Sequence, residues 1–208
     1  MRSLFLLAAS LAIPIAMPGQ DYPHHNFRAG LGAGVPGADL RPFFDPKVGF
    51  TVGYGYRFHR YFQADIGLDT IVGAAGVRDF AQTPLGYRRI RDFQYLVPMG
   101  GRVILPLAQG RFQFFAGGGG TYMRYSERIS QPNSYYQLDC PFCTSRGGWG
   151  YYATAGFQVA LDRYQHFRFG MGPRVYRGHT DGEPLGAVPG VRTRDQWINL
   201  MAEFGFSF

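Results

Sequence analysis

The last fifteen residues, Arg194–Phe208, read R-D-Q-W-I-N-L-M-A-E-F-G-F-S-F. Every second residue from the end is apolar, and the residues between them are mostly polar or small. The apolar set is Ile198, Leu200, Ala202, Phe204, Phe206 and Phe208. A period of two predicts a β-strand with one apolar face. Such a strand ending on an exposed Phe is typical of a transmembrane β-barrel, whose outer face meets lipid and whose last strand pairs with its first.

The composition agrees with a single all-β domain of 208 residues. Glycine is abundant (30 residues), aromatic residues make up 17% and charged residues only 17%. The formal net charge of +7 comes almost wholly from arginine, because Lys47 is the only lysine. A nucleic-acid-binding protein would cluster basic residues on one face, whereas here they are spread over turns, loops and inward positions. We therefore expect no nucleic-acid partner.

Residues 1–19 predict a secretory signal peptide. Arg2 is followed by the apolar run Leu4–Ala16, which is too short to cross a bilayer as a helix, and then by small residues. Cleavage is expected near Ala16 or Gly19, which leaves residues 20–208 as the barrel domain. No other segment approaches about 20 consecutive apolar residues, so no transmembrane helix is expected in the mature chain.

Seven further stretches alternate in the same way, so the sequence predicts an eight-stranded antiparallel up-and-down barrel. Their expected ranges are 26–35, 47–58, 61–72, 92–105, 111–124, 149–161 and 166–177. The connections after the first, third, fifth and seventh strands are long and the others short, as in outer-membrane barrels with short periplasmic turns and long external loops. Pro98 costs a ladder hydrogen bond in the fourth of these strands, so we expect a bulge or a local break there.

On this topology the outward aromatic residues form two belts, as a lipid-facing surface predicts. The belt at the periplasmic end contains Phe27, Tyr56, Phe58, Phe62, Phe112, Phe114, Phe167, Phe169, Phe206 and Phe208. The belt at the outer end contains Phe50, Phe93, Tyr95, Tyr122 and Tyr151. Both interfaces of the membrane would therefore be marked by ring side chains.

These features resemble the small eight-stranded outer-membrane barrels of the OmpA-like transmembrane domain, OmpX/Ail-like and OmpW-like type. The resemblance covers nearly the whole mature chain and rests on the signal peptide, the strand and loop rhythm, and the terminal F-G-F-S-F. It implies that Phe204, Phe206 and Phe208 are the signal read by the barrel assembly machinery. It also implies a Gram-negative outer-membrane location, with membrane lipids and lipopolysaccharide as partners, and we expect a monomer.

Eight charged residues are expected to point into the lumen. They are Arg28, Arg57, Asp65, Asp69, Arg102, Arg168, Arg174 and Glu203. Opposite charges in so narrow an interior should pair, because unpaired buried charges are costly. Two interpretations stay open: a salt-bridged core that fills the lumen, which we favour because eight strands leave space only for side chains, and a narrow path for ions or small solutes. The mid-strand run Gly117–Gly120 is expected to let the barrel curve and to make room for a large lumen side chain.

Two features fall in the expected external loops. Cys140 and Cys143 form a C-x-x-C without the strand–helix setting of a redox motif or a second ligand pair for zinc, so a small loop disulfide is expected in an oxidising envelope. Arg78, Arg88, Arg89 and Arg91 would face outward. They are candidate contacts for lipopolysaccharide phosphates, with ordinary solvated loop charge as the alternative.

The sequence predicts no catalytic, cofactor or metal site. The adjacent His24 and His25 lack a third ligand and are expected in a linker. No nucleophile and acid–base set matches the motif of a barrel enzyme, so we expect a non-enzymatic protein. The expected role is envelope structure or surface binding through the loops. The alternatives are the narrow path for ions or small solutes and a soluble lipocalin-like carrier, an eight-stranded barrel with its apolar faces inward. Such a carrier would leave glycine and a few charges as its solvent surface, and the chain lacks the N-terminal G-x-W motif.

Overall fold

The computed structural model describes residues 22–41, 44–71, 80–83, 86–129, 145–182 and 192–208. Nine strands are assigned in this part of the chain, together with the short 3₁₀ turn η2 (Ala108–Gly110). The strands are β1 (His25–Ala38), β2 (Lys47–His59), β3 (Phe62–Ile71), β4 (Phe80–Thr83), β5 (Gly86–Leu107), β6 (Phe112–Ile129), β7 (Ser145–Ala160), β8 (Phe167–Gly182) and β9 (Arg192–Ser207). Among the described residues, no helix is long and apolar enough to cross a membrane.

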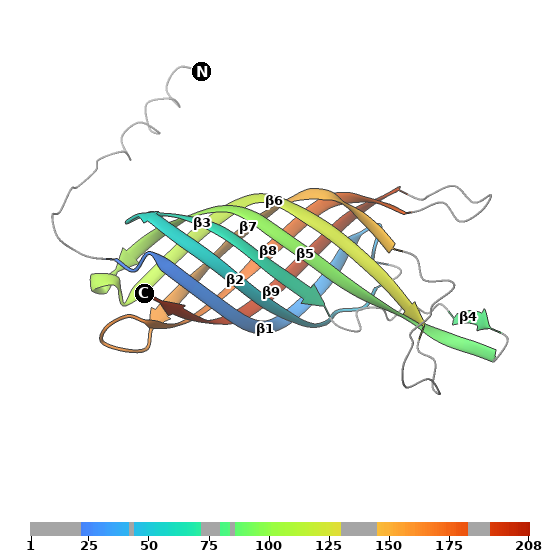
Figure 1. The fold of residues 1–208 in the computed structure, drawn as a ribbon, viewed down its shortest axis with the longest axis horizontal. Coiled ribbons are helices and arrows are strands. Elements are labelled where there is room, and N and C mark those ends of the chain that lie inside the picture. The colour runs from blue at the N-terminus through green and yellow to red at the C-terminus, as the bar shows by residue number, and fades with distance from the viewer. Residues whose placement is uncertain (1–21, 42–43, 72–79, 84–85, 130–144, 183–191) are drawn as a thin grey trace, which may run out of the picture.

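Eight of these strands close into an antiparallel barrel, which confirms the predicted fold. The sheet runs in the order β3-β2-β1-β9-β8-β7-β6-β5-β4, and an additional pairing of β3 with β5 closes the ring. The short β4 pairs with the part of β5 that extends past the barrel (Figure 1). As the terminal alternation predicts, β9 pairs with β1, from Asn26 opposite Ser207 to Ala38 opposite Asp195.

The C-terminus and the start of β1 lie at the same end of the barrel as the short connections (Figure 1). Backbone hydrogen bonds join His25 and Phe208 in both directions, at 2.8 and 3.0 Å. At this end β2 is separated from β3 by two residues, Arg60 and Tyr61, so the predicted tight hairpin is confirmed. We call this the periplasmic end and the opposite end the external end, following the rule for outer-membrane barrels.

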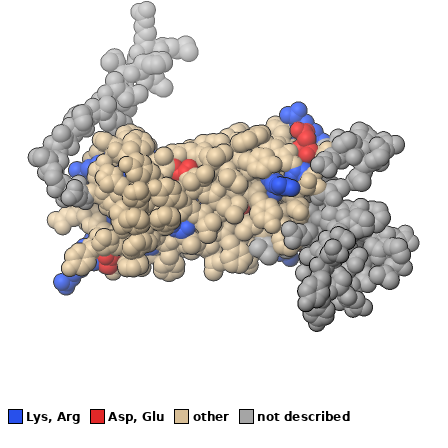
Figure 2. Space-filling view, viewed as in Figure 1, with Lys and Arg blue, Asp and Glu red and all other residues tan. Residues whose placement is uncertain are grey.

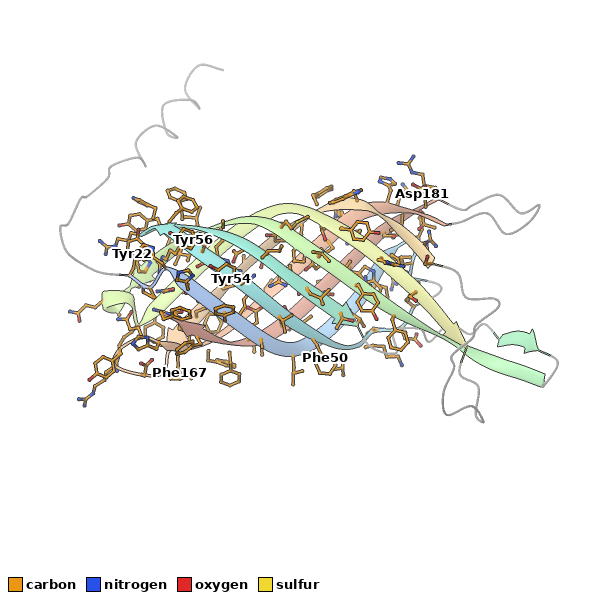
Figure 3. The ribbon with its side chains drawn as sticks, viewed as in Figure 1. Tyr22, Phe50, Tyr54, Tyr56, Phe167 and Asp181 are labelled. Atoms are coloured by element: carbon orange, nitrogen blue, oxygen red, sulfur yellow. The ribbon has the colours of Figure 1, made fainter. Side chains whose placement is uncertain are left out.

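The outward face of the barrel is apolar. On β9 the side chains of Leu200 and Phe204 are 52% and 63% exposed, while their neighbours Met201 and Glu203 are buried. Most of the visible wall between the two ends carries neither basic nor acidic atoms (Figure 2). Of the belt residues, Tyr56 and Phe167 lie near the periplasmic end and Phe50 lies farther along the barrel (Figure 3). An exposed apolar band of this kind is expected only where lipid replaces water.

The structure lengthens two of the predicted strands and shows a local break at Pro98. β5 and β6 run well past the expected bounds 92–105 and 111–124, because backbone pairing continues as far as Ile90 opposite Ile129. Pro98 causes no bulge: β3 and β5 keep the same register on either side of it, and only the ladder pairs opposite Gly67 and Leu68 are missing. The predicted local break is therefore present on the β3 side, while Pro98 remains paired with Thr121 of β6.

Candidate functional site

The inside of the barrel has room for large side chains because glycines face them. A Cβ added to Gly53 would lie 2.8 Å from Nε of Arg28. One added to Gly55 would lie 2.7 Å from Oδ1 of Asp65, and one added to Gly117 would lie 2.7 Å from Cβ of Arg102. These distances are too short for a real Cβ contact. The absence of a side chain at the inward glycines therefore leaves the space that the lumen arginines and carboxylates occupy.

Six of the eight predicted lumen charges form one continuous chain of ion pairs in the middle of the barrel. Asp65 pairs with Arg28, at 2.7 Å between Nη1 and Oδ1, and with Arg102. Arg28 also approaches Glu203, at 3.7 Å. Arg174 then pairs with Glu203, at 2.9 Å, and with Asp69. This chain of ion pairs contains three arginines and three carboxylates, so its charges balance.

Within this chain of ion pairs, Asp69 accepts hydrogen bonds from the largest number of side chains. Its carboxylate accepts hydrogen bonds from the hydroxyl of Tyr176 at 2.6 Å and from the hydroxyl of Thr51 at 2.7 Å, in addition to the guanidinium of Arg174. The amide of Asn199 lies 3.4 Å away. Because β3 and β8 stand on opposite sides of the ring, the pair of Asp69 and Arg174 bridges the lumen. Such a cross-brace holds the two walls together in a setting where an unpaired charge would be costly.

An aromatic and aliphatic layer fills the lumen between this ion chain and the external end. Its buried members are Leu40, Ile71, Leu96, Met123, Tyr125, Tyr152, Tyr176 and Trp197. Nε1 of Trp197 donates to the hydroxyl of Tyr125 at 3.0 Å, and Phe44 packs edge-on against Trp197. The alternation of β9 places Trp197 on the same face as Glu203, as the structure shows. The layer itself was not predicted, because the parity of one strand does not show which rings of other strands meet at the same level.

A polar layer lies beyond the aromatic one, nearest the external end. Arg146 donates to the hydroxyl and carbonyl of Thr180, at 3.1 and 3.2 Å, and to the hydroxyl of Thr193. Asp195 is buried and accepts hydrogen bonds from Thr180 and Thr193, the latter at 2.6 Å. The described residues therefore place interacting side chains at three successive levels of the lumen: the ion chain, the aromatic layer and this polar layer.

The last two predicted lumen charges, Arg57 and Arg168, differ from the rest. Both are buried at the periplasmic end, but in the described part of the chain neither forms an ion pair with a carboxylate, contrary to the expectation that inward charges pair. Arg57 donates twice to the carbonyl of Arg60, at 3.1 and 2.6 Å. Arg168 donates to the carbonyl of Gly110 and to the side chain of Gln165. The cavity between these arginines and the ion chain is only about 20 Å³, close to the size of a single water site.

Several predicted residues lie outside what the structure describes. Cys140, Cys143 and Arg78 fall in undescribed segments, and of Arg88, Arg89 and Arg91 only the backbone in β5 is described. His24 and His25 are placed: their Nδ1 atoms lie 2.8 Å from the carbonyl of Arg57 and from the hydroxyl of Tyr54. Among the described residues, no group of three or more His, Cys, Asp and Glu is arranged to hold a metal ion.

An apolar wall around a packed, charged interior defines a transmembrane β-barrel and is the reverse of a lipocalin-like carrier, which would hold its apolar surface inside. The predicted Phe204, Phe206 and Phe208 accordingly face outward from β9 and the C-terminus, each more than 40% exposed. The family model of the outer membrane protein beta-barrel domain matches residues 3–188. The chain belongs to this family and is an outer-membrane protein.

Solved structures with the same architecture come from bacterial outer membranes. Neisserial surface protein A (NspA) is 11% identical with a TM-score of 0.56, and the match covers 88% of this chain and 97% of that one. Ail, the attachment invasion locus protein of Yersinia pestis, is 12% identical with a TM-score of 0.48, covering 89% and 100% of the two chains. AlkL is 11% identical with a TM-score of 0.49, covering 92% and 95%. No curated protein matches the chain in sequence. At these identities the likeness extends to the fold alone.

Proposed function

We propose that the protein is a non-enzymatic barrel that serves envelope structure and surface binding, with its outer rim holding lipopolysaccharide. The observation that carries this proposal is a groove of about 570 Å³ on the outside of β7, β8 and β9, close to the external end. It combines the exposed rings of Trp149 and Tyr151 with the exposed basic side chains of Arg177, His179 and Arg194. Asp181, which follows on β8, lies at this end in Figure 3.

Rings beside guanidinium groups suit the level at which acyl chains give way to headgroups. The ring of Trp149 packs edge-on against Tyr122, so the apolar side of the groove is preformed. Arg guanidinium groups bind phosphate oxygens in a bidentate manner, so basic residues at the external rim suit the phosphates of lipopolysaccharide. The four predicted loop arginines belong to the same end by sequence, and the groove adds basic residues on the barrel wall.

Arg177 and Arg194 differ in whether a carboxylate already pairs with their guanidinium group. Arg194 contacts Asp39 at 3.4 Å, and backbone and side-chain hydrogen bonds from Arg194 lower the pKa of Asp39, so this carboxylate stays ionised. Arg177 forms no ion pair within the described residues. We therefore expect Arg177 to contribute more to phosphate binding than Arg194.

Replacing both Arg177 and Arg194 by glutamine should weaken lipopolysaccharide binding by about tenfold, because two charge-assisted contacts to phosphate are lost. Purified protein would be placed in phosphatidylcholine nanodiscs and titrated with fluorescent lipopolysaccharide. The control is Arg111→Gln, which removes an exposed basic side chain at the opposite end that does not line the groove. Equal affinities for the double variant and this control, or no binding by the unmodified protein, would contradict the proposed partner.

A further inference from the structure

A second cavity opens at the periplasmic end and is unrelated to the groove on the outer rim. Its volume is about 230 Å³, and it is lined by the start of the described chain, the end of β2 and the turns that join β2 to β3, β5 to β6 and β7 to β8. Tyr22, one of its lining residues, lies at this end in Figure 3. A single water needs only about 10–15 Å³ of such space, so the cavity can admit a small polyatomic ion with its hydration.

The lining of this cavity is strongly basic. It includes four arginines, Arg57, Arg60, Arg163 and Arg168, and no aspartate or glutamate among the residues that the structure describes. The other polar side chains that line it are hydroxyl and amide groups, from Tyr22, Tyr164, Gln109, Gln113 and Gln165. All of these can donate a hydrogen bond to an anion.

Neutral acceptors hold the two deeper arginines in place. The guanidinium of Arg57 is fixed by the carbonyl of Arg60 and lies over the ring of Tyr22, 5.4 Å from its centroid. Arg168 is fixed by the carbonyl of Gly110 at 3.3 Å and by Gln165 at 3.1 Å, and the amide oxygen of Gln113 lies within 2.9 Å once that amide is correctly oriented. These contacts position the charges without neutralising them.

The periplasmic mouth differs from the middle of the lumen in its charge balance. In the middle, three arginines form ion pairs with three carboxylates, whereas the four arginines of the mouth form no ion pair with a described carboxylate. The acidic residue of the β7–β8 turn, Asp162, is held outside the cavity lining, since its carboxylate accepts from the backbone N–H groups of His166 and Phe167 at 3.2 and 2.8 Å. Its negative charge still acts on Arg168, so it offsets part of the positive charge of the mouth without forming an ion pair there. Like charges gathered and fixed in this way favour an anion between them.

We propose that the periplasmic mouth is a binding site for a phosphate group. The guanidinium fork matches phosphate oxygens in geometry, and the surrounding amides and hydroxyls complete a set of donors, with no carboxylate among the described residues that line the cavity. Two sources can present this group on the periplasmic side: soluble phosphate, or the headgroup of a phospholipid in the inner leaflet next to the rim. The site takes the same chemistry from either source.

The test uses the folded full-length mature protein in a non-ionic, phosphate-free detergent. One arm titrates inorganic phosphate by calorimetry. The other incubates the protein with short-chain phosphatidylglycerol or with diacylglycerol, which lacks the phosphate, and measures retained lipid by native mass spectrometry. Each arm compares the unmodified protein with Arg60→Gln/Arg163→Gln, whose changes lie in turns, and with Arg57→Gln/Arg168→Gln inside the mouth. The matched control is Arg41→Gln/Arg124→Gln, which removes two exposed arginines that line neither the mouth nor the lipopolysaccharide groove. The gel shift on boiling shows that each variant is folded.

Phosphate binding that falls by about tenfold or more in either mouth variant, but not in the control, would support the site with soluble phosphate as its source. Retention of phosphatidylglycerol but not diacylglycerol, lost in a folded mouth variant, would support it with a lipid headgroup as the source. Absence of binding in both arms, or equal binding by the mouth variants and the control, would overturn the proposal. Neither result bears on the lipopolysaccharide groove, because the mouth variants keep Arg177 and Arg194, whose replacement tests the groove separately.

Discussion

Replacing Asp69 by alanine is expected to destabilise the folded barrel by about 3–5 kcal/mol, the usual cost of removing one partner from a buried ion pair. The side chain of Asp69 is fully buried and accepts from Arg174, Tyr176 and Thr51. Its loss leaves Arg174 with Glu203 as its remaining carboxylate. It also leaves the hydroxyl of Tyr176 without an acceptor and removes the brace across the lumen.

The measurement is urea unfolding of the protein in phospholipid vesicles, followed by tryptophan fluorescence and by the gel shift on boiling. Asp181→Asn is the matched control, because its ion pair with Arg192 is exposed on both sides. Exposed pairs contribute under about 1 kcal/mol, so this control should unfold close to the unmodified protein. If Asp69→Ala unfolded as late as the control, the ion chain would not be what holds the lumen together.

Replacing Gly32 by valine is expected to prevent closure of the barrel. A Cβ at this position would lie 1.9 Å from the carbonyl oxygen of Leu200 and 2.6 Å from Sδ of Met201. The carbonyl belongs to the backbone of β9, which pairs with β1 along the seam that closes the ring, so it cannot move without breaking that seam. The penalty should therefore exceed the about 1–3 kcal/mol of ordinary overpacking in a core.

The same substitution at the next residue provides the control. Ala33 is exposed on the outer face, where a valine would add apolar surface toward lipid. We expect the folded, heat-modifiable band in the outer-membrane fraction to be at background for Gly32→Val and normal for Ala33→Val. A normal folded band for Gly32→Val would show that the space beside Met201 is not required for closure.

Most of the barrel could be predicted from a period of two alone. The alternation around Phe204 and Leu200 decides which face meets lipid, and the same parity correctly places all eight inward charges. Strand ends were harder to predict, because the extension of β5 and β6 is held by backbone pairing, which requires no apolar pattern. At Pro98 the expected interruption is found on the β3 side alone, because a proline interrupts the ladder on one side of a strand and leaves the other intact.

The contacts inside the lumen could not be predicted in the same way. Which arginine meets which carboxylate depends on the stagger of the strands, and the pair of Arg174 and Asp69 spans opposite sides of the ring, 105 positions apart in sequence. The aromatic layer around Trp197 was not predicted, because parity gives the face of each ring but not the stagger that brings rings of different strands to one level. Nor does parity indicate that Arg57 and Arg168 lack acidic partners, since that depends on the turns that meet at the mouth.

We propose that side chains close the lumen and that the protein acts through its outer surface and loops. Single-channel recording in planar bilayers, after insertion of refolded protein that shifts on boiling, tests this proposal. Because the ion chain and the aromatic layer around Trp197 occupy successive levels of the interior, we predict insertion without a steady open-channel current. A stable, reproducible conductance from the unmodified barrel would contradict the account and favour a narrow channel for ions or small solutes.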